Sequence, residues 1–256
     1  MSDLRNHVIK YLAKGIRFDG RKLAQLRPAI VQYGISETAE GSARVKIGNT
    51  EILAGVKLSV EKPYPDTPDQ GNLMVGAELL PMSSPEFESG PPDIKSIELA
   101  RVVDRGIRES KMIDTKALVV VKGEKVWTIV IDIVTVNDDG NLLDAASLAA
   151  LAALMDTRFP SYDGKEIKYR EKTDKKLPLS SKNPLAVTVW KIGDSFIVDP
   201  TPEEESVVDA RLTISTTDDN VLCALQKGGD EPLTSGEVAE AVEIAMEKAA
   251  EFRRCL

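Results

Sequence analysis

The segment from residue 142 to residue 155 constrains the fold more than any other part of the chain. It reads LLDAASLAALAALM and is predicted to be a helix with apolar side chains on almost every side. A helix of this kind has to be covered all round, so it belongs in the core between other layers. No run of 18 or more apolar residues occurs in the sequence. We therefore expect a buried core helix and no membrane-spanning segment.

Segments rich in Val, Ile and Trp flank this helix and are predicted to form β-hairpins. Leu73–Leu80 is predicted as one more strand, and the proline-rich stretch from Lys62 to Asp69 has to be irregular. A final helix, Val238–Phe252, begins after a capping box formed by Thr234 and Glu237. The predicted hairpins are Ala43–Val60, Leu118–Val136, Leu185–Asp199 and Arg211–Lys227.

This order of elements, hairpins followed by a helix and then the same again, predicts an α+β fold with two similar halves. The helices would pack against mostly antiparallel sheets, and a doubly wound parallel sheet is not expected. We predict an N-terminal helix in residues 1–15, a first half in 16–160, a connection in 161–184 and a second half in 185–256. The basic run within the connection, Lys165 to Lys176, is interpreted as a solvated loop, with RNA contact as the less favoured alternative.

The inventory of reactive side chains excludes several classes of enzyme. The chain has one histidine, His7, and two cysteines, Cys223 and Cys255, so a Ser-His-Asp triad or a His-rich zinc site is not expected. No phosphate-binding glycine loop is present. The N-terminus lacks the layout of a signal peptide, so we expect a cytoplasmic protein. The net charge of −8 disfavours general nucleic-acid binding, and any RNA contact requires a local concentration of arginines.

The predicted helix Ile94–Ser110 offers such a concentration. Arg101, Arg105 and Arg108 fall within about 60° of one another around the helix axis. The apolar side chains lie on the opposite face. Guanidinium groups match phosphate oxygens, so the stripe suits an RNA backbone. The alternative is an ordinary solvated face, with Asp104 and Glu98 as partners within the helix.

Two acidic segments have alternative interpretations. The stretch from Asp199 to Glu205, followed by Asp209, has the carboxylates for Mg²⁺ binding or acid catalysis, but a charged loop between two strands is favoured. The segment Asp138–Asn141 precedes a helix, yet its two carboxylates disfavour phosphate binding there. We interpret it as a turn and helix cap. No metal site, cofactor or catalytic residue is predicted.

Several stretches taken together resemble the RNase PH-like family, in particular its non-catalytic subunit of the archaeal exosome. The resemblance runs from about residue 16 to the C-terminal helix, and its motifs follow one another in the right order. The stretches that carry it are Ile16–Arg21 (with its RxDGR pattern), Tyr64–Asp69, Glu86–Asp93, Ile97–Ser110, Asp138–Ala145 and Val198–Thr201.

The resemblance implies duplicated ββα-rich halves of the RNase PH (ribosomal S5 domain 2-like) type. It also implies a hexameric ring of three heterodimers, in which this subunit alternates with a catalytic RNase PH-like paralogue. RNA-binding cap subunits would sit on the ring. Single-stranded RNA would be shortened from its 3′ end with inorganic phosphate as the attacking group. Arg101 and Arg105 would then reach the RNA near the partner's active site, whereas Arg108 has a carboxylate as the competing partner.

Departures from the catalytic members of this family predict that the chain is inactive alone. Active relatives carry a GGTR-like phosphate loop where this chain has Gly140-Asn141-Leu142-Leu143. Of two aspartates six residues apart in active relatives, the later is retained as Asp209 and the earlier is replaced by Glu203. One alternative is an active phosphorolytic exoribonuclease that works as a homo-oligomer. The other is a small-molecule kinase on a related ββα-type domain, and the missing phosphate loop argues against both.

Overall fold

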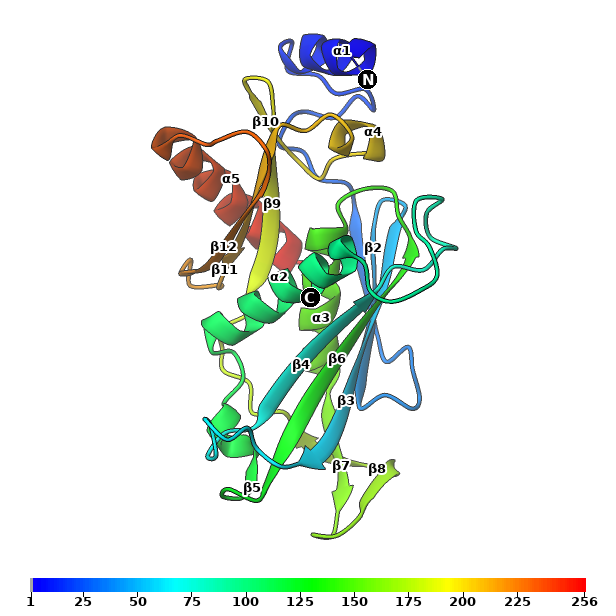
Figure 1. The fold of residues 1–256 in the computed structure, drawn as a ribbon, viewed down its shortest axis with the longest axis vertical. Helices are drawn as coiled ribbons and strands as arrows, with labels where there is room; N and C mark the ends of the chain where they lie inside the picture. Colours follow the sequence, from blue (N-terminus) through cyan, green and yellow to red (C-terminus); the bar gives the residue numbers. More distant parts are fainter. Residues whose placement is uncertain (1) are drawn as a thin grey trace.

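The computed structural model describes residues 2–256 and contains two main β-sheets with helices between and outside them (Figure 1). The first sheet has the strand order β1-β2-β3-β6-β4, and β5 pairs with the first residues of β6. Helix α2 (Ile94–Ser110) connects β4 to the following strands, so β4 runs parallel to β6 while the other pairs are antiparallel. The strands are β1 (Ala29–Tyr33), β2 (Gly41–Ile47), β3 (Thr50–Glu61), β4 (Asn72–Glu78), β5 (Val119–Val121) and β6 (Lys125–Asn137).

The second sheet is antiparallel, with the order β10-β9-β11-β12. Helix α5 (Ser235–Arg253) contacts β9 and β11 through a stripe of buried small residues that ends at Phe252. The capping box of Thr234 and Glu237 is present at its start. The four strands are β9 (Leu185–Ile192), β10 (Ser195–Val198), β11 (Ala210–Thr216) and β12 (Leu222–Gly229). All the predicted hairpins are therefore confirmed, as is the α+β class with mostly antiparallel sheets.

Helix α3 (Leu142–Asp156) lies between the two sheets and contacts β2 and β3 on one side and β9 on the other (Figure 1). Every residue from Leu143 to Leu154 is buried, as its all-round apolar character predicts. Its many alanines allow close approach of the strands. At Gly41 in β2, an added Cβ would lie 2.5 Å from the carbonyl oxygen of Ala153. Helix α3 thus joins both sheets into one core.

The interpretation of Lys165 to Lys176 as a loop is wrong, because most of this run forms a strand. Strands β7 (Arg158–Tyr162) and β8 (Ile167–Lys176) pair as an antiparallel hairpin at the end of the molecule opposite the N-terminal helix (Figure 1). Two aromatic residues of β7 attach the hairpin to the first sheet. The rings of Phe159 and Tyr162 lie 5.1 and 5.5 Å from Trp127 in edge-to-face geometry.

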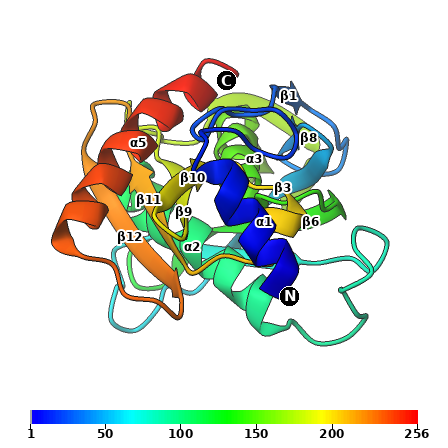
Figure 2. The same cartoon turned by 90° about the horizontal axis from the view of Figure 1, so that it is seen from above.

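Helix α1 (Ser2–Leu12) packs on the far end of the second sheet, as seen from above in Figure 2. Val8 and Leu12 are buried against Trp190, Ile192 and Ile197. Together these residues belong to a second, small core. His7 is exposed on this helix. Among the helices of residues 2–256, none combines the length and the apolar character that a membrane crossing needs.

Candidate nucleic-acid interface and the start of helix α3

Helix α2 is capped at its N-terminus and buried along one face, and this orients its arginines. Asp93 caps its N-terminus, and the Asp93 carboxylate accepts a hydrogen bond of 2.8 Å from the amide of Ser96. Leu99, Val103 and Ile107 are buried against the core, as predicted. The arginines therefore lie on the outward face of α2.

The three arginines of this face differ in their partners. Arg108 forms an ion pair with Asp104 (Nη2 to Oδ1, 2.7 Å) and also donates to the carbonyl of Leu73. The hydrogen bond to the Asp104 carboxylate and the Asp104 charge raise the pKa of Arg108. Arg105 makes one long hydrogen bond of 3.4 Å to the side chain of Gln226. Arg101 has no ion pair or side-chain hydrogen bond with any residue in 2–256.

The surroundings of Arg101 and Arg105 are partly apolar. Both side chains line a shallow surface hollow together with Ile94 and Ile97, which are 84% and 49% exposed. Exposed large apolar side chains beside guanidinium groups are typical of an interaction surface, because Arg and apolar anchors are enriched there. We therefore regard Arg101 and Arg105 as the candidate contact residues, with Arg108 engaged within the chain.

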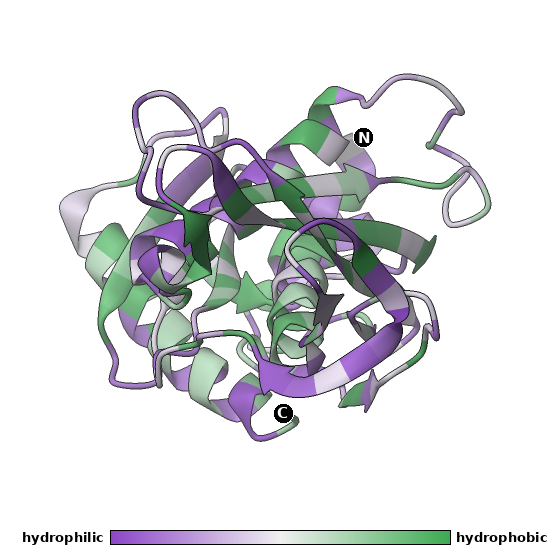
Figure 3. Ribbon diagram, turned by 90° about the horizontal axis from the view of Figure 1, so that it is seen from below, coloured by the Kyte–Doolittle hydropathy of each residue, from purple (hydrophilic) through white to green (hydrophobic). Residues whose placement is uncertain are grey.

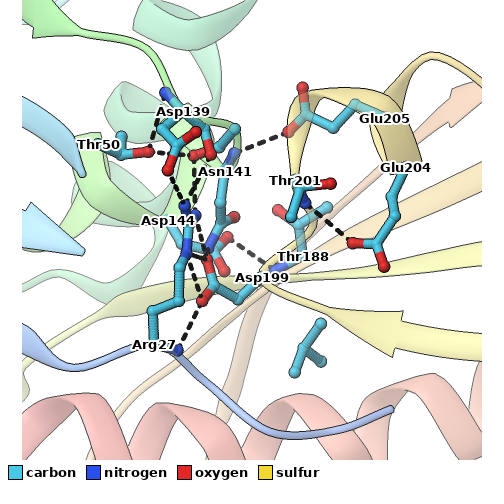
Figure 4. A network of polar contacts seen from close by, with 12 residues as sticks. Arg27, Thr50, Asp139, Asn141, Asp144, Thr188, Asp199, Thr201, Glu204 and Glu205 are labelled. Carbon is cyan, nitrogen blue, oxygen red and sulfur yellow. Dashed lines mark hydrogen bonds and ion pairs between the residues drawn. The ribbon is translucent and has the colours of Figure 1, made fainter. Parts of the chain in front are cut away.

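The loop before helix α3 is closed by packing against the segment that follows β10 (Figure 4). Gly140 has φ +82°, and an added Cβ there would collide with the carbonyl oxygen of Pro200. Asn141 also adopts the left-handed conformation, with φ +64°. The Asn141 side chain does not cap the helix and instead donates to Asp199 Oδ1 at 3.0 Å. The predicted turn is confirmed, but its contacts are with distant residues.

A carboxylate of the chain itself occupies the start of helix α3. The backbone amide of Asn141 donates to Glu205 Oε1 at 2.7 Å. An anion at this position is favourable because the helix dipole places partial positive charge there. Burial raises the pKa of Glu205 to about 7, although its hydrogen bond from Asn141 acts in the opposite direction. The helix terminus that could receive a phosphate is thus already occupied by a carboxyl group of the chain itself.

The hollow beside this terminus is acidic. Its charged lining comprises four carboxylates, Glu86, Glu98, Asp138 and Glu205, and two cations, Lys95 and Arg211. Both cations are paired within the chain. Arg211 Nη2 lies 2.6 Å from Glu98 Oε2, and Lys95 Nζ lies 2.9 Å from Glu86 Oε2. A phosphate ion entering the hollow would meet an excess of negative charge.

The stretch after β10 connects two strands, as predicted, but it contains the short helix α4 and two of its carboxylates are buried, which the sequence did not indicate. Asp199 is fully buried and binds Arg27 (Nη2 to Oδ1, 2.6 Å) and Arg21 (Nη1 to Oδ2, 2.8 Å), as Figure 4 shows in part. Burial alone would raise the pKa of Asp199, but the hydrogen bonds and charges of Arg27 and Arg21 hold it below its usual value. Arg27 also donates to the carbonyl of Asp139 at 2.7 Å, so it fastens the loop before α3.

A second buried ion pair lies next to the first. Helix α4 (Pro202–Glu205) places Glu204 against Arg17, whose Nε donates to Glu204 Oε1 at 2.9 Å. Arg17 also donates to the carbonyls of Val198 and Asp199. The arginines of the RxDGR pattern, Arg17 and Arg21, therefore fix the segment that supplies Asp199 and Glu205. The sequence signal was the pattern itself, whereas nothing local marked Arg27.

Of the other two carboxylates that the sequence singled out, Asp209 has partners within residues 2–256 and Glu203 has none. Asp209 accepts hydrogen bonds from Arg5 of helix α1 (2.9 Å) and from the amide of Gly193 (2.7 Å). Glu203 is exposed on α4. Within residues 2–256, no three His, Cys, Asp or Glu side chains gather closely enough to hold a metal ion.

Two family models match the chain. The model of the 3′ exoribonuclease family (RNase PH), domain 1, matches residues 25–160, and that of domain 2 matches residues 182–248. The chain belongs to the RNase PH family. The resemblance seen in the sequence and the expected pair of RNase PH-type domains are thereby confirmed.

The chain is similar to archaeal proteins described as exosome complex component Rrp42. It is 48% identical to the one from Methanothermobacter thermautotrophicus over 239 residues, which cover 92% of this chain and 88% of that protein. It is 44% identical to the one from Methanosarcina acetivorans, over 97% of this chain and 91% of that protein. These alignments span nearly the whole length of this RNase PH member.

Solved structures show the same fold. A chain of the Archaeoglobus fulgidus exosome with RNA bound to the active site superposes with a TM-score of 0.92 and 44% identity, covering 99% of this chain and 97% of that chain. A chain of an archaeal exosome core gives a TM-score of 0.87 and 42% identity, covering 98% and 95%. Rice Rrp46, at 19% identity and a TM-score of 0.69, shares the fold.

Proposed function

We propose that this protein is the non-catalytic RNase PH-like subunit of an archaeal exosome ring. In this proposal it alternates with a catalytic paralogue in a hexamer of three heterodimers, below RNA-binding cap subunits. The ring shortens single-stranded RNA from its 3′ end with inorganic phosphate as the attacking group. The relatives' names and the RNA-bound archaeal neighbour support this assignment.

One observation carries the non-catalytic part of the proposal: Glu205 occupies the start of helix α3. Phosphorolysis requires a phosphate ion to bind and its developing charge to be stabilised by donors. Here the adjoining hollow has four carboxylates and two cations that are already paired. Loss of a single such donor costs about 10²- to 10³-fold in rate. We therefore expect no measurable phosphorolysis by this chain alone.

The outward face of α2 carries the RNA-binding part of the proposal. Arg101 and Arg105 are exposed and have at most one weak partner among residues 2–256, so their guanidinium groups are available to phosphates. The neighbouring Ile94 and Ile97 offer apolar area to a partner subunit. In the assembled ring this face would complete the partner's active site and bind the RNA there.

The first test is a phosphorolysis assay with single-stranded RNA, Mg²⁺ and inorganic phosphate. The chain is assayed alone and after mixing with its RNase PH-like partner, and nucleoside diphosphate release is measured. We expect no release by the chain alone and strong release by the mixture. Clear release by the chain alone would refute the non-catalytic assignment.

The second test compares two arginines of the same helix. Arg105→Gln should weaken RNA binding by the assembled complex and lower the salt dependence of log Kd by about 0.7, the value for one phosphate contact with a single strand. Arg108→Gln is the matched control, because Arg108 already pairs with Asp104 and should have the smaller effect. Size-exclusion chromatography checks that both variants still assemble. Unchanged RNA affinity in Arg105→Gln would rule out its role.

A further inference from the structure

Strand β8 carries a concentration of positive charge in a chain that is acidic overall. Residues 165–176 contain six Lys or Arg and three Asp or Glu, whereas the whole chain has 33 and 41. Nearly all of β8 is exposed, and Figure 3 shows hydrophilic colour along the hairpin at the end of the molecule facing the viewer. The charge is therefore displayed to solvent on a strand and is not buried in the core.

The acidic residues of β8 do not neutralise this surface. Glu171 lies 3.8 Å from Lys168, and Asp174 lies 3.5 Å from Arg158 of β7. Four other cations of β8 make no ion pair with any residue in the described range, 2–256: Arg170, Lys172, Lys175 and Lys176. Lys125, at the neighbouring β5–β6 turn, adds a positive charge at the hairpin tip, where its Nζ donates to the carbonyl of Gly164 at 3.1 Å.

The backbone of β8 is irregular at the centre of this surface. Ser161 pairs with Lys168 and Pro160 pairs with Lys172, so Tyr169, Arg170 and Glu171 have no partners on β7. Such a bulge redirects side chains and is frequent beside functional sites. The ring of Tyr169 remains 44% exposed, with Lys57 Nζ 4.7 Å from its centroid. This exposed ring thus has Lys57, which is paired with Glu40 at 2.7 Å, beside it, and is followed along β8 by Arg170, which has no ion pair within residues 2–256.

We propose that the β8 bulge is an additional binding surface for single-stranded RNA. A base stacks on Tyr169 while Arg170 and Lys172 bind the adjoining phosphates. This combination of an aromatic platform and flanking cations is the chemistry by which proteins hold single strands without reading their sequence. The inference rests on the proposed function, because it extends the RNA path to a surface separate from helix α2.

The test uses the complex of this chain with its RNase PH-like partner and a fluorescent oligoadenylate of about 30 nucleotides, long enough to cover more than one contact site. Anisotropy is measured over a series of potassium chloride concentrations. Tyr169→Ala should weaken binding roughly 10-fold without changing charge, through lost stacking. The double variant Arg170→Gln/Lys172→Gln should lower the salt slope by about 1.4, for two phosphate contacts.

The matched control is Lys10→Gln/Lys14→Gln, which removes the same charge from exposed positions at the helix α1 end of the molecule. It should leave RNA affinity unchanged. If neither β8 variant weakens binding while Arg105→Gln does, the β8 surface is refuted and the proposed function stands. If Arg105→Gln also leaves RNA affinity unchanged, the RNA-binding part of both proposals is refuted. If the β8 variants no longer bind the partner subunit but keep their RNA affinity, the surface is a protein-docking site and the inference is wrong.

Discussion

Asp199→Asn is the substitution that most directly tests the buried ion network. Asp199 is fully buried and forms ion pairs with Arg27 and Arg21, whose side chains are each 10% exposed. Its backbone has φ +50°, a left-handed conformation that Asn tolerates well, so the variant removes charge with little backbone strain. The two arginines would lose their shared counter-charge inside the protein.

The expected loss in the free energy of unfolding depends on the ion pairs that each arginine retains in the variant. Removal of one partner of a buried ion pair typically costs 3–5 kcal/mol. Arg21 retains Asp19 at 2.6 Å and Arg27 retains Asp139 at 3.1 Å, so we expect the lower end of that range, about 3 kcal/mol. For a chain of this size, that corresponds to a fall in Tm of roughly 6–12 °C.

Thermal and urea unfolding followed by circular dichroism measure this loss, with Asp139→Asn as the control. The Asp139 side chain is 37% exposed and Arg27 keeps Asp199 in that variant, so the control should lose less than about 1 kcal/mol. The folded-state pKa of Asp199 is depressed. Its stabilisation is therefore full at neutral pH and fades as the pH falls below about 4 towards that lowered pKa. Equal Tm values for Asp199→Asn and Asp139→Asn at pH 7 would refute the reasoning.

Two further substitutions test burial and close packing. Burial raises the pKa of Asp144 to about 8, so the folded chain retains a proton that the unfolded chain releases above about pH 4. The stability of the wild type relative to Asp144→Asn should therefore fall as pH rises from about 4 to about 8, and a pH-independent difference in urea midpoints would contradict this assignment. Gly41→Ala should lose about 1–3 kcal/mol because its Cβ meets the backbone of helix α3. Gly236→Ala, with open space around it, should lose nothing, and equal Tm values for the two would show that β2 and α3 are not closely packed.

Elements with a strong periodic pattern were predicted almost to the residue. Helix α2 runs from Ile94 to Ser110 as expected, because Asp93 caps it and the apolar spacing is regular. Helix α3 was predicted to be buried because its composition leaves no polar face. Strand β8 was not predicted, because it is mostly charged and lacks the alternation of apolar and polar residues that indicates a strand. The hairpin is attached through edge-to-face contacts of Phe159 and Tyr162 with Trp127, which lies on another strand more than 30 residues earlier.

The candidate site was only partly predictable for the same reason. The arginine stripe of α2 follows from helical spacing alone, and so does the Arg108–Asp104 pair four residues apart. The burial of Asp199 and Glu204 does not, because their partners Arg27 and Arg17 lie 172 and 187 residues away. The local sequence around these carboxylates does not distinguish them from exposed carboxylates in a solvated loop.

The amino-acid sequence by itself determined which segments form most of the helices and hairpins, which faces are apolar, and that the loop before α3 has no Lys, Arg, Ser or Thr side chain. These properties depend on neighbours within a few residues. Only the tertiary structure decided which charges are paired and which are free. Glu205 meets the Asn141 amide, and Arg27 meets Asp199, because α3 and the second sheet pack together. The strength of a charge interaction depends on distance and burial in the folded chain, and separation along the sequence specifies neither.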